Sequence, residues 1–144
     1  MGARVPVSRA TLATLGRSGR CRPWHPAGMT AARVDIVDDT YLRVAPAVVR
    51  GWFDDDERLT RLWPHLHRTL VRDRGVKGLR WTVDGAVVGE MEVWIEPWWD
   101  GVILHHYVRG TRGRGAPADV ARRHQLRWKR AVHALKDRLE EATL

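Results

Sequence analysis

Three segments of alternating apolar and polar residues follow one another between positions 78 and 109. The side chains of a β-strand point alternately to its two faces, so this alternation is typical of strands that bury one face. Two short turn sequences separate the segments, at 84–86 (Asp-Gly-Ala) and at 97–100 (Pro-Trp-Trp-Asp), and both favour antiparallel hairpins. The stretch therefore predicts three consecutive antiparallel strands of one sheet.

The first hairpin needs a three-residue loop if its two strands are to share an apolar face. A two-residue Asp-Gly turn would move Met91 to the polar face, because a slip of one residue turns a whole strand over. The three-residue loop places Trp81 beside Gly89, whose bare backbone an aromatic ring would cover. It also places Arg80 opposite Glu90 as a cross-strand ion pair on the outer face.

The second hairpin is expected to use all four residues 97–100 as its loop, with Glu96 opposite Gly101. Glu92 and His105 then face each other on the outer side of the sheet. The inner face of the three strands is apolar except for one ionisable side chain, a histidine. This predicted inner face consists of Leu79, Trp81, Val83, Met91, Val93, Ile95, Val102, Leu104, His106 and Val108.

A long amphipathic helix is predicted to cover that face. It begins near Pro117, a residue type favoured at the first helical position, and ends at about Ala142, a length of about 39 Å at 1.5 Å per residue. Apolar residues recur at the three- and four-residue spacing of a buried stripe, and charged residues occupy the far side. The stripe consists of Val120, His124, Trp128, Ala131, Val132, Leu135 and Leu139.

The front half of the domain is predicted to contain a strand at 34–44, a short helix that Pro46 opens, a second short helix, and a strand at 66–72. Asp54 is expected to cap the second helix, with Glu57 as its partner in a capping box. The order of elements predicts an α+β fold. In this fold a curved antiparallel sheet of about five strands wraps on the long C-terminal helix, and two short helices follow the first strand.

Length and charge narrow the classes of function. At 144 residues the chain is large enough for one core, and its formal charge of +8 raises nucleic-acid binding as a hypothesis. However, residues 1–28 contain five arginines and no acidic residue, so from Met29 onward 20 basic residues stand against 17 acidic ones. The charges in that part are interspersed, and we therefore expect no nucleic-acid partner.

Residues 1–32 lack apolar periodicity and are predicted to be a disordered basic leader in front of a domain at 33–142. We expect Met29 to be the true start and the leader to be dispensable for folding; an organelle transit peptide is the alternative. Cys21, the only cysteine, lies in the leader, which leaves the domain without a disulfide or a zinc-cysteine site. No apolar run approaches a membrane span. These features favour a cytoplasmic protein with no cofactor and no stable membrane insertion.

Five motifs and the order of the elements point to a known superfamily. The motifs are the Ala45-Pro46 helix entry, Asp-Glu-Arg-Leu-Thr-Arg-Leu-Trp-Pro at 56–64, Gly-Leu-Arg-Trp-Thr-Val at 78–83, Gly-Glu-Met-Glu-Val-Trp-Ile-Glu-Pro at 89–97 and Trp-Lys-Arg-Ala at 128–131. With them, residues 33–142 resemble the START-like (SRPBCC, helix-grip) superfamily, and within it the polyketide cyclase/dehydrase and lipid-transport family. The resemblance implies a hydrophobic cavity between sheet and C-terminal helix that holds lipids, polyketides or other apolar small molecules. The chain departs from the family in having five predicted strands where six or seven are usual.

The candidate ligand-binding residues line the inner face of the sheet and the helix stripe opposite it. They are Trp81, Met91, Val93, Leu104, His106, His124 and Trp128. An imidazole at position 106 could donate a hydrogen bond to a ligand carbonyl or act as general acid or base, and hydrogen bonding within the core is the alternative. His124 and Trp128, one helical turn apart, either line the mouth of the pocket or belong to the core.

Three further patterns have simpler explanations. His65-x-His67 has metal-ligand spacing, but no third ligand is near it in the sequence, and we expect no metal. Glu90 and Glu92 lie on the outer face, where a solvated ladder of charges explains them better than acid/base chemistry. Trp98 and Trp99 at a hairpin tip could cover the cavity entrance, form a contact in a homodimer or touch a membrane surface.

The function expected from the sequence and its resemblance is binding or transport of an apolar small molecule. The alternatives are a polyketide cyclase or dehydratase of the same fold, with the histidine at 106 or a tyrosine as acid/base, and a protein- or ribosome-binding module. Converging polar groups in a pocket would favour the enzyme, a smooth apolar pocket the carrier. A filled core with exposed tryptophans at the hairpin tip would favour the binding module.

Overall fold

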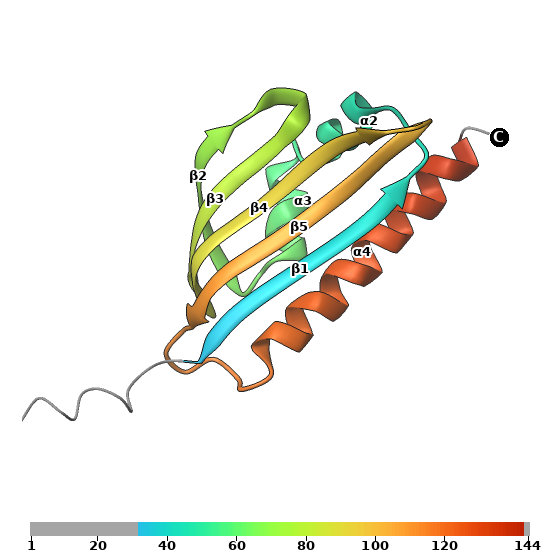
Figure 1. Cartoon of the computed structure of the whole chain (residues 1–144). Helices are drawn as coiled ribbons and strands as arrows, with labels where there is room; N and C mark the ends of the chain where they lie inside the picture. The colour runs from blue at the N-terminus through green and yellow to red at the C-terminus, as the bar shows by residue number, and fades with distance from the viewer. Residues whose placement is uncertain (1–31, 143–144) are drawn as a thin grey trace, which may run out of the picture. The chain divides into compact units, whose positions relative to one another are not determined.

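The computed structural model describes residues 32–142, and Figure 1 shows a curved antiparallel sheet with one long helix beside it. The strands are β1 (Arg33–Leu42), β2 (Leu66–Asp73), β3 (Gly78–Gly85), β4 (Val87–Trp98) and β5 (Gly101–Arg112). The helices are α2 (Pro46–Trp52), α3 (Asp56–Leu62), the 3-10 turn η2 (Gly75–Lys77) and α4 (Val120–Ala142). The predicted α+β fold of five strands, two short helices and a long C-terminal helix is confirmed. The predicted leader lies outside the described residues.

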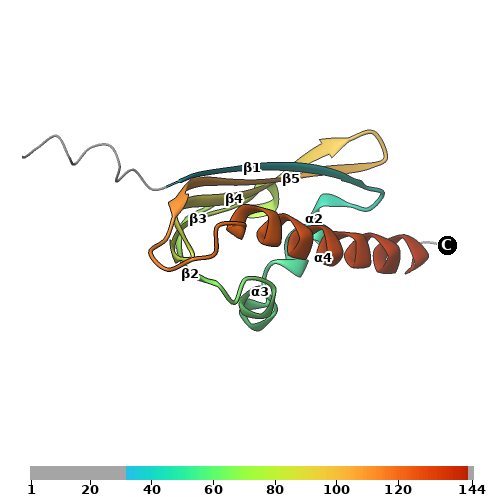
Figure 2. The ribbon, with the colours of Figure 1, turned by 90° about the horizontal axis from the view of Figure 1, so that it is seen from below.

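The strand order in the sheet is β1-β5-β4-β3-β2, and every neighbouring pair is antiparallel. Figure 2 shows α2, α3 and α4 on the same face of the sheet, with α4 beneath β1 and β5. The first strand closes one side of the sheet by pairing along its whole length with β5. The other side ends at β2, an edge strand with a bulge between Leu70 and Arg72.

The register of the β3–β4 hairpin differs by two residues from the prediction. Trp81 lies opposite Met91, and Gly89 lies opposite Val83. The reason for a glycine at position 89 is the close approach of β5 rather than an aromatic ring on β3. A Cβ at this position would lie 2.1 Å from the carbonyl oxygen of Arg109. The expected pairing of Trp81 with Gly89 is therefore wrong. A shift of two residues leaves each side chain on its original face, so the predicted faces survive the error.

The β4–β5 register is also shifted by two residues, because the turn is shorter than predicted. Trp98 lies opposite Gly101, and the turn consists of Trp99 and Asp100, with Trp99 at a φ of 53°. Pro97 belongs to the strand rather than to the loop. It is tolerated there because β3 pairs with β4 only as far as Trp94, so this end of β4 has one neighbour.

Two helix starts also differ from the sequence-based boundaries. The long helix begins at Val120 rather than near Pro117, and the Val120 N–H donates to the Pro117 carbonyl oxygen in a turn that precedes it. The cap of α3 is Asp55, whose side chain accepts a hydrogen bond from the Arg58 N–H. Asp54, the predicted cap, instead forms an ion pair with Arg50.

Candidate functional site

The inner face of the sheet contains the ten residues that the alternation predicted. Each of them is at most 5% exposed. All seven candidate ligand-binding residues belong to this layer or to the part of α4 that covers it, and none is more than 3% exposed. The structure therefore brings Trp81, Met91, Val93, Leu104, His106, His124 and Trp128 together in the core.

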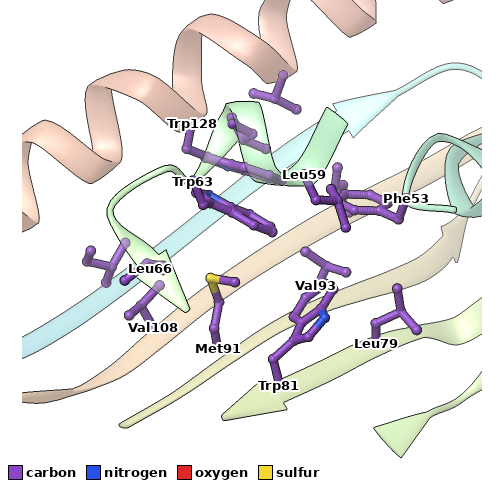
Figure 3. Packing of buried hydrophobic residues seen from close by; sticks show 14 of the residues in the cluster. Phe53, Leu59, Trp63, Leu66, Leu79, Trp81, Met91, Val93, Val108 and Trp128 are labelled. Carbon is purple, nitrogen blue, oxygen red and sulfur yellow. The ribbon is translucent and has the colours of Figure 1, made fainter. Parts of the chain in front are cut away.

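Trp63, which the candidate set omitted, packs against the histidine and tryptophan members of that set, and Figure 3 shows it beside Trp128. It follows the last residue of α3 and is fully buried. Its ring stacks on those of His106, His124 and Trp128, with centroid distances of 5.5, 6.2 and 6.0 Å. Trp63 and these three rings thus fill the space in which the sequence analysis predicted a ligand. The sequence signal for Trp63 is its spacing of four residues after Leu59 and one after Leu62, both inward-facing on α3, just before Pro64.

Three histidines form a hydrogen-bonded chain through this layer. His106 Nδ1 lies 3.1 Å from the Glu92 carbonyl oxygen, and its Nε2 lies 2.8 Å from Nε2 of His124. His124 Nδ1 lies 3.0 Å from Nε2 of His65, which is half-buried in the α3–β2 connection. The chain therefore leads from a buried backbone carbonyl to the protein surface.

Hydrogen-bond geometry fixes the tautomer of each neutral ring. A carbonyl oxygen can only accept, so His106 carries its hydrogen on Nδ1 and donates to Glu92. Its Nε2 lone pair then accepts from Nε2–H of His124, and the remaining lone pair of His124 accepts from Nε2–H of His65. Each of the three bonds has one donor and one acceptor only when the hydrogens are arranged in this order.

Burial keeps the three rings neutral. Desolvation lowers the pKa of His106 to about 4, although the Glu92 carbonyl and the charge of Asp38 oppose the shift. The pKa of His124 is lowered to about 2, first by desolvation and then by the neighbouring His106, His65 and Arg127. The pKa of His65 is also lowered, first by desolvation and then by Arg127.

This chain of imidazoles does not have the geometry of a metal site. His124 uses both of its nitrogens for two different neighbours, so the three rings do not converge on one point as ligands of an ion would. Within residues 32–142, no group of three histidine, cysteine or acidic side chains is arranged to hold a metal ion.

Asp38 of β1 adds a second ionisable side chain to the inner face, whose part from β3, β4 and β5 contains only His106, as expected. It lies opposite His106 on β1 and accepts hydrogen bonds from Trp128 Nε1 (2.9 Å) and Thr40 Oγ1 (3.1 Å). Lys129 forms an ion pair with it. Burial acts to raise the pKa of this carboxyl, but the hydrogen bonds from Lys129 and Trp128 outweigh burial, and its pKa lies below the ordinary value.

A hollow of about 260 Å³ opens beside this layer, between helices α2 and α3 and strands β2 and β3. We call it the α2–β3 cleft. Trp81 is a member of the candidate set that lines it. Its apolar lining consists of Phe53, Leu59, Leu70, Leu79 and Trp81, and its charged lining of Arg50, Asp54, Asp56, Arg68 and Asp73.

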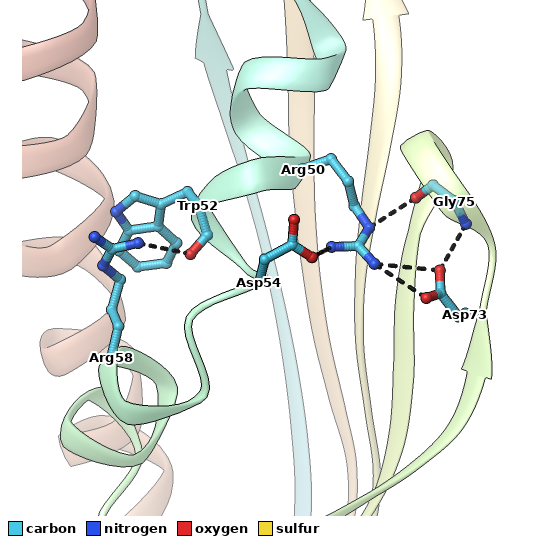
Figure 4. Close-up of polar contacts among 6 residues, drawn as sticks. All are labelled: Arg50, Trp52, Asp54, Arg58, Asp73 and Gly75. Carbon is cyan, nitrogen blue, oxygen red and sulfur yellow. Dashed lines mark hydrogen bonds and ion pairs between the residues drawn. The ribbon is translucent and has the colours of Figure 1, made fainter.

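Two arginines connect the helices to the edge strand across the mouth of the α2–β3 cleft. Arg50 of α2 pairs with Asp54 and with Asp73 of β2, and its Nε donates to the Gly75 carbonyl oxygen at 2.8 Å (Figure 4). Arg68 of β2 donates to Asp56 and Thr60 of α3, at 3.3 and 3.0 Å. Both guanidinium groups are already neutralised, so the mouth is charged but offers no free cation.

The outer face of the sheet has a polar centre that the predicted register misplaced. His105 lies opposite Trp94 rather than Glu92, and its two ring nitrogens contact carboxylate oxygens of Asp39 and Glu96. Since carboxylate oxygens only accept, both contacts are satisfied when the imidazole carries both hydrogens. The indole of Trp94 stacks on the same ring at 4.5 Å.

The tip of the β4–β5 hairpin presents two indoles to solvent. Trp99 is 90% exposed and Trp98 is 48% exposed. Asp100 holds this tip against β1 by accepting hydrogen bonds from the Tyr41 hydroxyl and from Arg43 Nε, the latter at 2.7 Å. The adjoining hollow of about 310 Å³ is lined by Tyr41, Trp98, Trp99 and Asp100.

The comparisons with known proteins identify the fold. The sequence matches no protein-family model and no curated protein. Among solved structures, the Aha1 dimer from Colwellia psychrerythraea is similar with a TM-score of 0.54 and 13% identity, covering 72% of this chain and 94% of that one. The Mll3558 protein from Rhizobium loti is similar with a TM-score of 0.57 and 11% identity, covering 74% of this chain and 99% of that one. Ara h 8.0201 also matches, with a TM-score of 0.44 and 12% identity over 70% of this chain and 92% of that one.

At these identities the likeness to the first two structures establishes a shared architecture, a curved antiparallel sheet packed on a long C-terminal helix, and nothing about ligands. Within residues 32–142, no helix is long and apolar enough to cross a membrane.

Proposed function

We propose that this protein binds a small, neutral, largely apolar molecule in the α2–β3 cleft. The observation that carries the proposal is the base of the cleft, to which the largely buried Trp81 and Leu79 of the sheet and Phe53 and Leu59 of the helical side contribute beneath a charged mouth. Ligand sites typically combine such a lining with a few polar groups near the mouth. The stacked rings fill the predicted central cavity, and together with the exposed Trp98 and Trp99 this is the pattern that favours a binding module, the second candidate below. The proposed ligand site therefore lies beside the stacked rings rather than in their place.

Size and charge define the class of ligand. The volume of about 260 Å³ is below the usual range of ligand pockets, about 300–1,000 Å³, and suits a compound of one or two rings. Three carboxylates and two arginines line the cleft, and both arginines are bonded to acidic side chains. An anionic ligand would gain no unpaired cation there, so a neutral one is favoured.

The carrier is favoured over an enzyme of the same fold by the bonding of the histidines. His106 and His124 use all four of their ring nitrogens for hydrogen bonds to each other, to Glu92 and to His65. None of the three histidines lines the cleft. A general acid or base must reach the reacting atom, which here would require the chain to break.

Titration with 1-naphthol, observed through leucine methyl signals in carbon–proton NMR spectra, tests this proposal. The methyl signals of Leu59 and Leu79 should shift with one binding curve, while those of Leu104, which lies in the core away from the cleft lining, should stay in place. The probe should also raise the melting temperature by mass action. Shifts confined to other residues, with Leu59 and Leu79 unmoved, would contradict the proposed site.

A matched pair of variants localises binding. Leu70 lines the cleft and is 51% exposed, so Leu70→Trp should fill the space without disturbing the core. We expect it to weaken binding by about tenfold or more, corresponding to about 1.4 kcal/mol. The neighbouring Val71 is 53% exposed and does not line the cleft, so Val71→Trp should leave the affinity unchanged.

A second candidate function is binding of a second copy of this chain through the hairpin tip, favoured by the 90% exposure of Trp99. Large exposed aromatic residues typically mark contact sites. The similar Aha1 protein was solved as a dimer. Sedimentation equilibrium should then show a dimer that Trp99→Ser dissociates and that Val76→Ser, a control at a residue 47% exposed in η2, leaves intact. A monomeric wild-type chain would remove this candidate.

A further inference from the structure

A surface groove between α3 and α4 combines an apolar floor with a basic rim. Leu62, Ala131 and Ala134 line the inner part of this hollow of about 760 Å³ and are called its floor, and Leu126 lies at its outer edge. The rim consists of Arg61 from α3 and Arg123, Arg127 and Arg130 from α4. We call it the arginine groove; it shares no lining residue with the α2–β3 cleft.

The basic rim is only partly neutralised by the protein itself. Arg123 pairs with Asp119 at 2.9 Å, and Arg61 pairs with the exposed Glu57 at 3.9 Å. Among the described residues, Arg127 and Arg130 form no ion pair with an acidic side chain. Both are exposed, so the centre of the groove carries positive charge that an acidic partner would neutralise.

The spacing of the rim residues matches one side of a helix. Arg123, Arg127 and Arg130 are separated by four and three residues, which places them in a row along α4. Ala131 and Ala134 have the smallest side chains of the floor, so another helix can approach the axis of α4 closely. The groove therefore offers a row of charges beside a shallow apolar channel.

We propose that the arginine groove binds an acidic amphipathic helix of a partner protein. Its apolar stripe would lie on Leu62 and the two alanines, its carboxylates, one helical turn apart, would pair with Arg127 and Arg130, and its outer edge would contact Leu126. Recognition of an amphipathic helix by a groove of this kind uses apolar anchors at three- and four-residue spacing together with flanking charges. The groove accounts for the exposure of Leu126, 51%, in the middle of a basic surface.

Charge and shape separate this partner from other occupants. The chain's own residues 1–28 contain five arginines and no acidic residue, so the rim would repel them. A membrane surface is contacted by apolar side chains that project outward. Here the part of the floor next to α3 is recessed, because Leu62 is only 8% exposed and Ala131 is half-buried, and only Leu126 at the outer edge projects strongly. A nucleic acid would use the arginines but not the apolar floor.

The experiment measures fluorescence anisotropy of a labelled synthetic peptide of 18 residues, designed as a helix with leucines on one side and glutamates flanking them. A peptide of the same composition in scrambled order is the first control. At physiological salt the full chain should bind the amphipathic peptide about tenfold or more tighter than the scrambled one, because only the ordered peptide presents both stripe and charges. Equal affinities would mean nonspecific charge attraction and would overturn the proposal.

Variants of the chain then locate the binding surface. The double variant Arg127→Glu with Arg130→Glu should weaken the amphipathic peptide by at least about tenfold, and Leu126→Ser by several-fold without any change of charge. Arg114→Glu, at an exposed position in the β5–α4 connection outside the groove, should leave binding within about twofold. A double variant that binds as the wild type does would overturn the proposal.

Three competitor measurements decide between occupants. If phosphatidylserine vesicles bind the chain and the peptide does not, the occupant of the groove is a membrane surface rather than a partner helix. Single-stranded DNA that displaces the peptide and is insensitive to Leu126→Ser would favour nucleic acid. A dimer that the double variant dissociates would make the groove a self-interface. Each of these three results overturns the proposal, whereas failure of all three with specific peptide binding supports it.

Discussion

His124 Nε2 donates a hydrogen bond of 2.8 Å to His106 Nε2 in a part of the core where neither ring is exposed to solvent. The bond links the C-terminal helix to the centre of the sheet, because His124 belongs to α4 and His106 to β5. It forms only while His106 Nε2 is unprotonated and free to accept. The packing of helix on sheet is therefore coupled to the protonation of the core.

Stability should fall with acid in the range where unfolded histidines take up protons. The folded pKa of His106 is about 4 and that of His124 about 2, both below the ordinary value of 6.5. The unfolded state therefore binds more protons below about pH 6.5, and the free energy of unfolding decreases as the pH falls from there toward the folded pKa values. Urea denaturation at pH 7.5, 6.5, 5.5 and 4.5 measures the slope. A free energy of unfolding that is constant between pH 6.5 and 4.5 would contradict the neutral state of the buried histidines.

The bond between the two histidines should appear as a coupling energy. Replacing His106 with phenylalanine leaves the Nε2–H of His124 and the Glu92 carbonyl oxygen without partners, at about 1–3 kcal/mol for each buried group. His124→Phe leaves the Nε2 lone pair of His106 and the N–H of His65 unpaired. Each single variant breaks the bond between the two histidines, but the double variant loses it only once. The sum of the two single losses in the free energy of unfolding should therefore exceed the loss in the double variant by about 0.5–3 kcal/mol. Additive effects would indicate that the two rings pack independently.

The sequence predicted the face of the sheet on which each side chain lies better than it predicted the cross-strand partner of each residue. Strand alternation depends only on parity, so shifting two hairpin registers by two residues left all ten residues of the inner face correctly assigned. Registers depend on turn geometry. The turn after β4 needs a positive φ at Trp99, and a bulky aromatic residue gives no indication in the sequence that it will adopt one. The β1 pairing could not be predicted at all, because it joins segments about 70 residues apart.

The candidate site was predicted only in part, for a related reason. Periodicity identified His106, His124 and Trp128 as facing each other, but it contains no information on whether they enclose a ligand or touch directly. Trp63 decides this question. Its ring reaches the stack from the end of α3, an element whose position over the sheet no local pattern determines. Alternation along β1 places Asp38 inward together with Ile36 and Thr40, so the sequence pattern also indicates this residue.

Two glycines should respond oppositely to alanine. A Cβ on Gly89 would lie 2.1 Å from the Arg109 carbonyl oxygen and 2.6 Å from the Cα of Gly110, both backbone atoms that cannot move away separately. Gly89→Ala should therefore destabilise the sheet by several kcal/mol or prevent folding. At Gly51 in α2 nothing lies within 4 Å of a Cβ, so Gly51→Ala should stabilise by about 0.5–1 kcal/mol through helix propensity. Thermal melts of the two variants beside the wild type make the comparison; a harmless Gly89→Ala would refute the close approach of β4 and β5.

Arg127 should control the protonation of the exposed end of the histidine chain. Its charge lowers the pKa of His65, as desolvation does to a greater extent, and it acts in the same direction on His124. Arg127→Gln removes the charge but keeps a long polar side chain, so the pKa of His65 should rise while remaining below its ordinary value, because the burial is unchanged. Proton–nitrogen NMR of the imidazole side chains as a function of pH measures this shift directly. Arg114→Gln is the matched control and should leave the His65 titration in place, because Arg114 is not among the groups that shift its pKa. If the acidic helix proposed above binds at Arg127, its carboxylates should raise the His65 pKa of the wild-type chain as well, and an unchanged titration at saturating peptide would separate that binding event from the arginine groove.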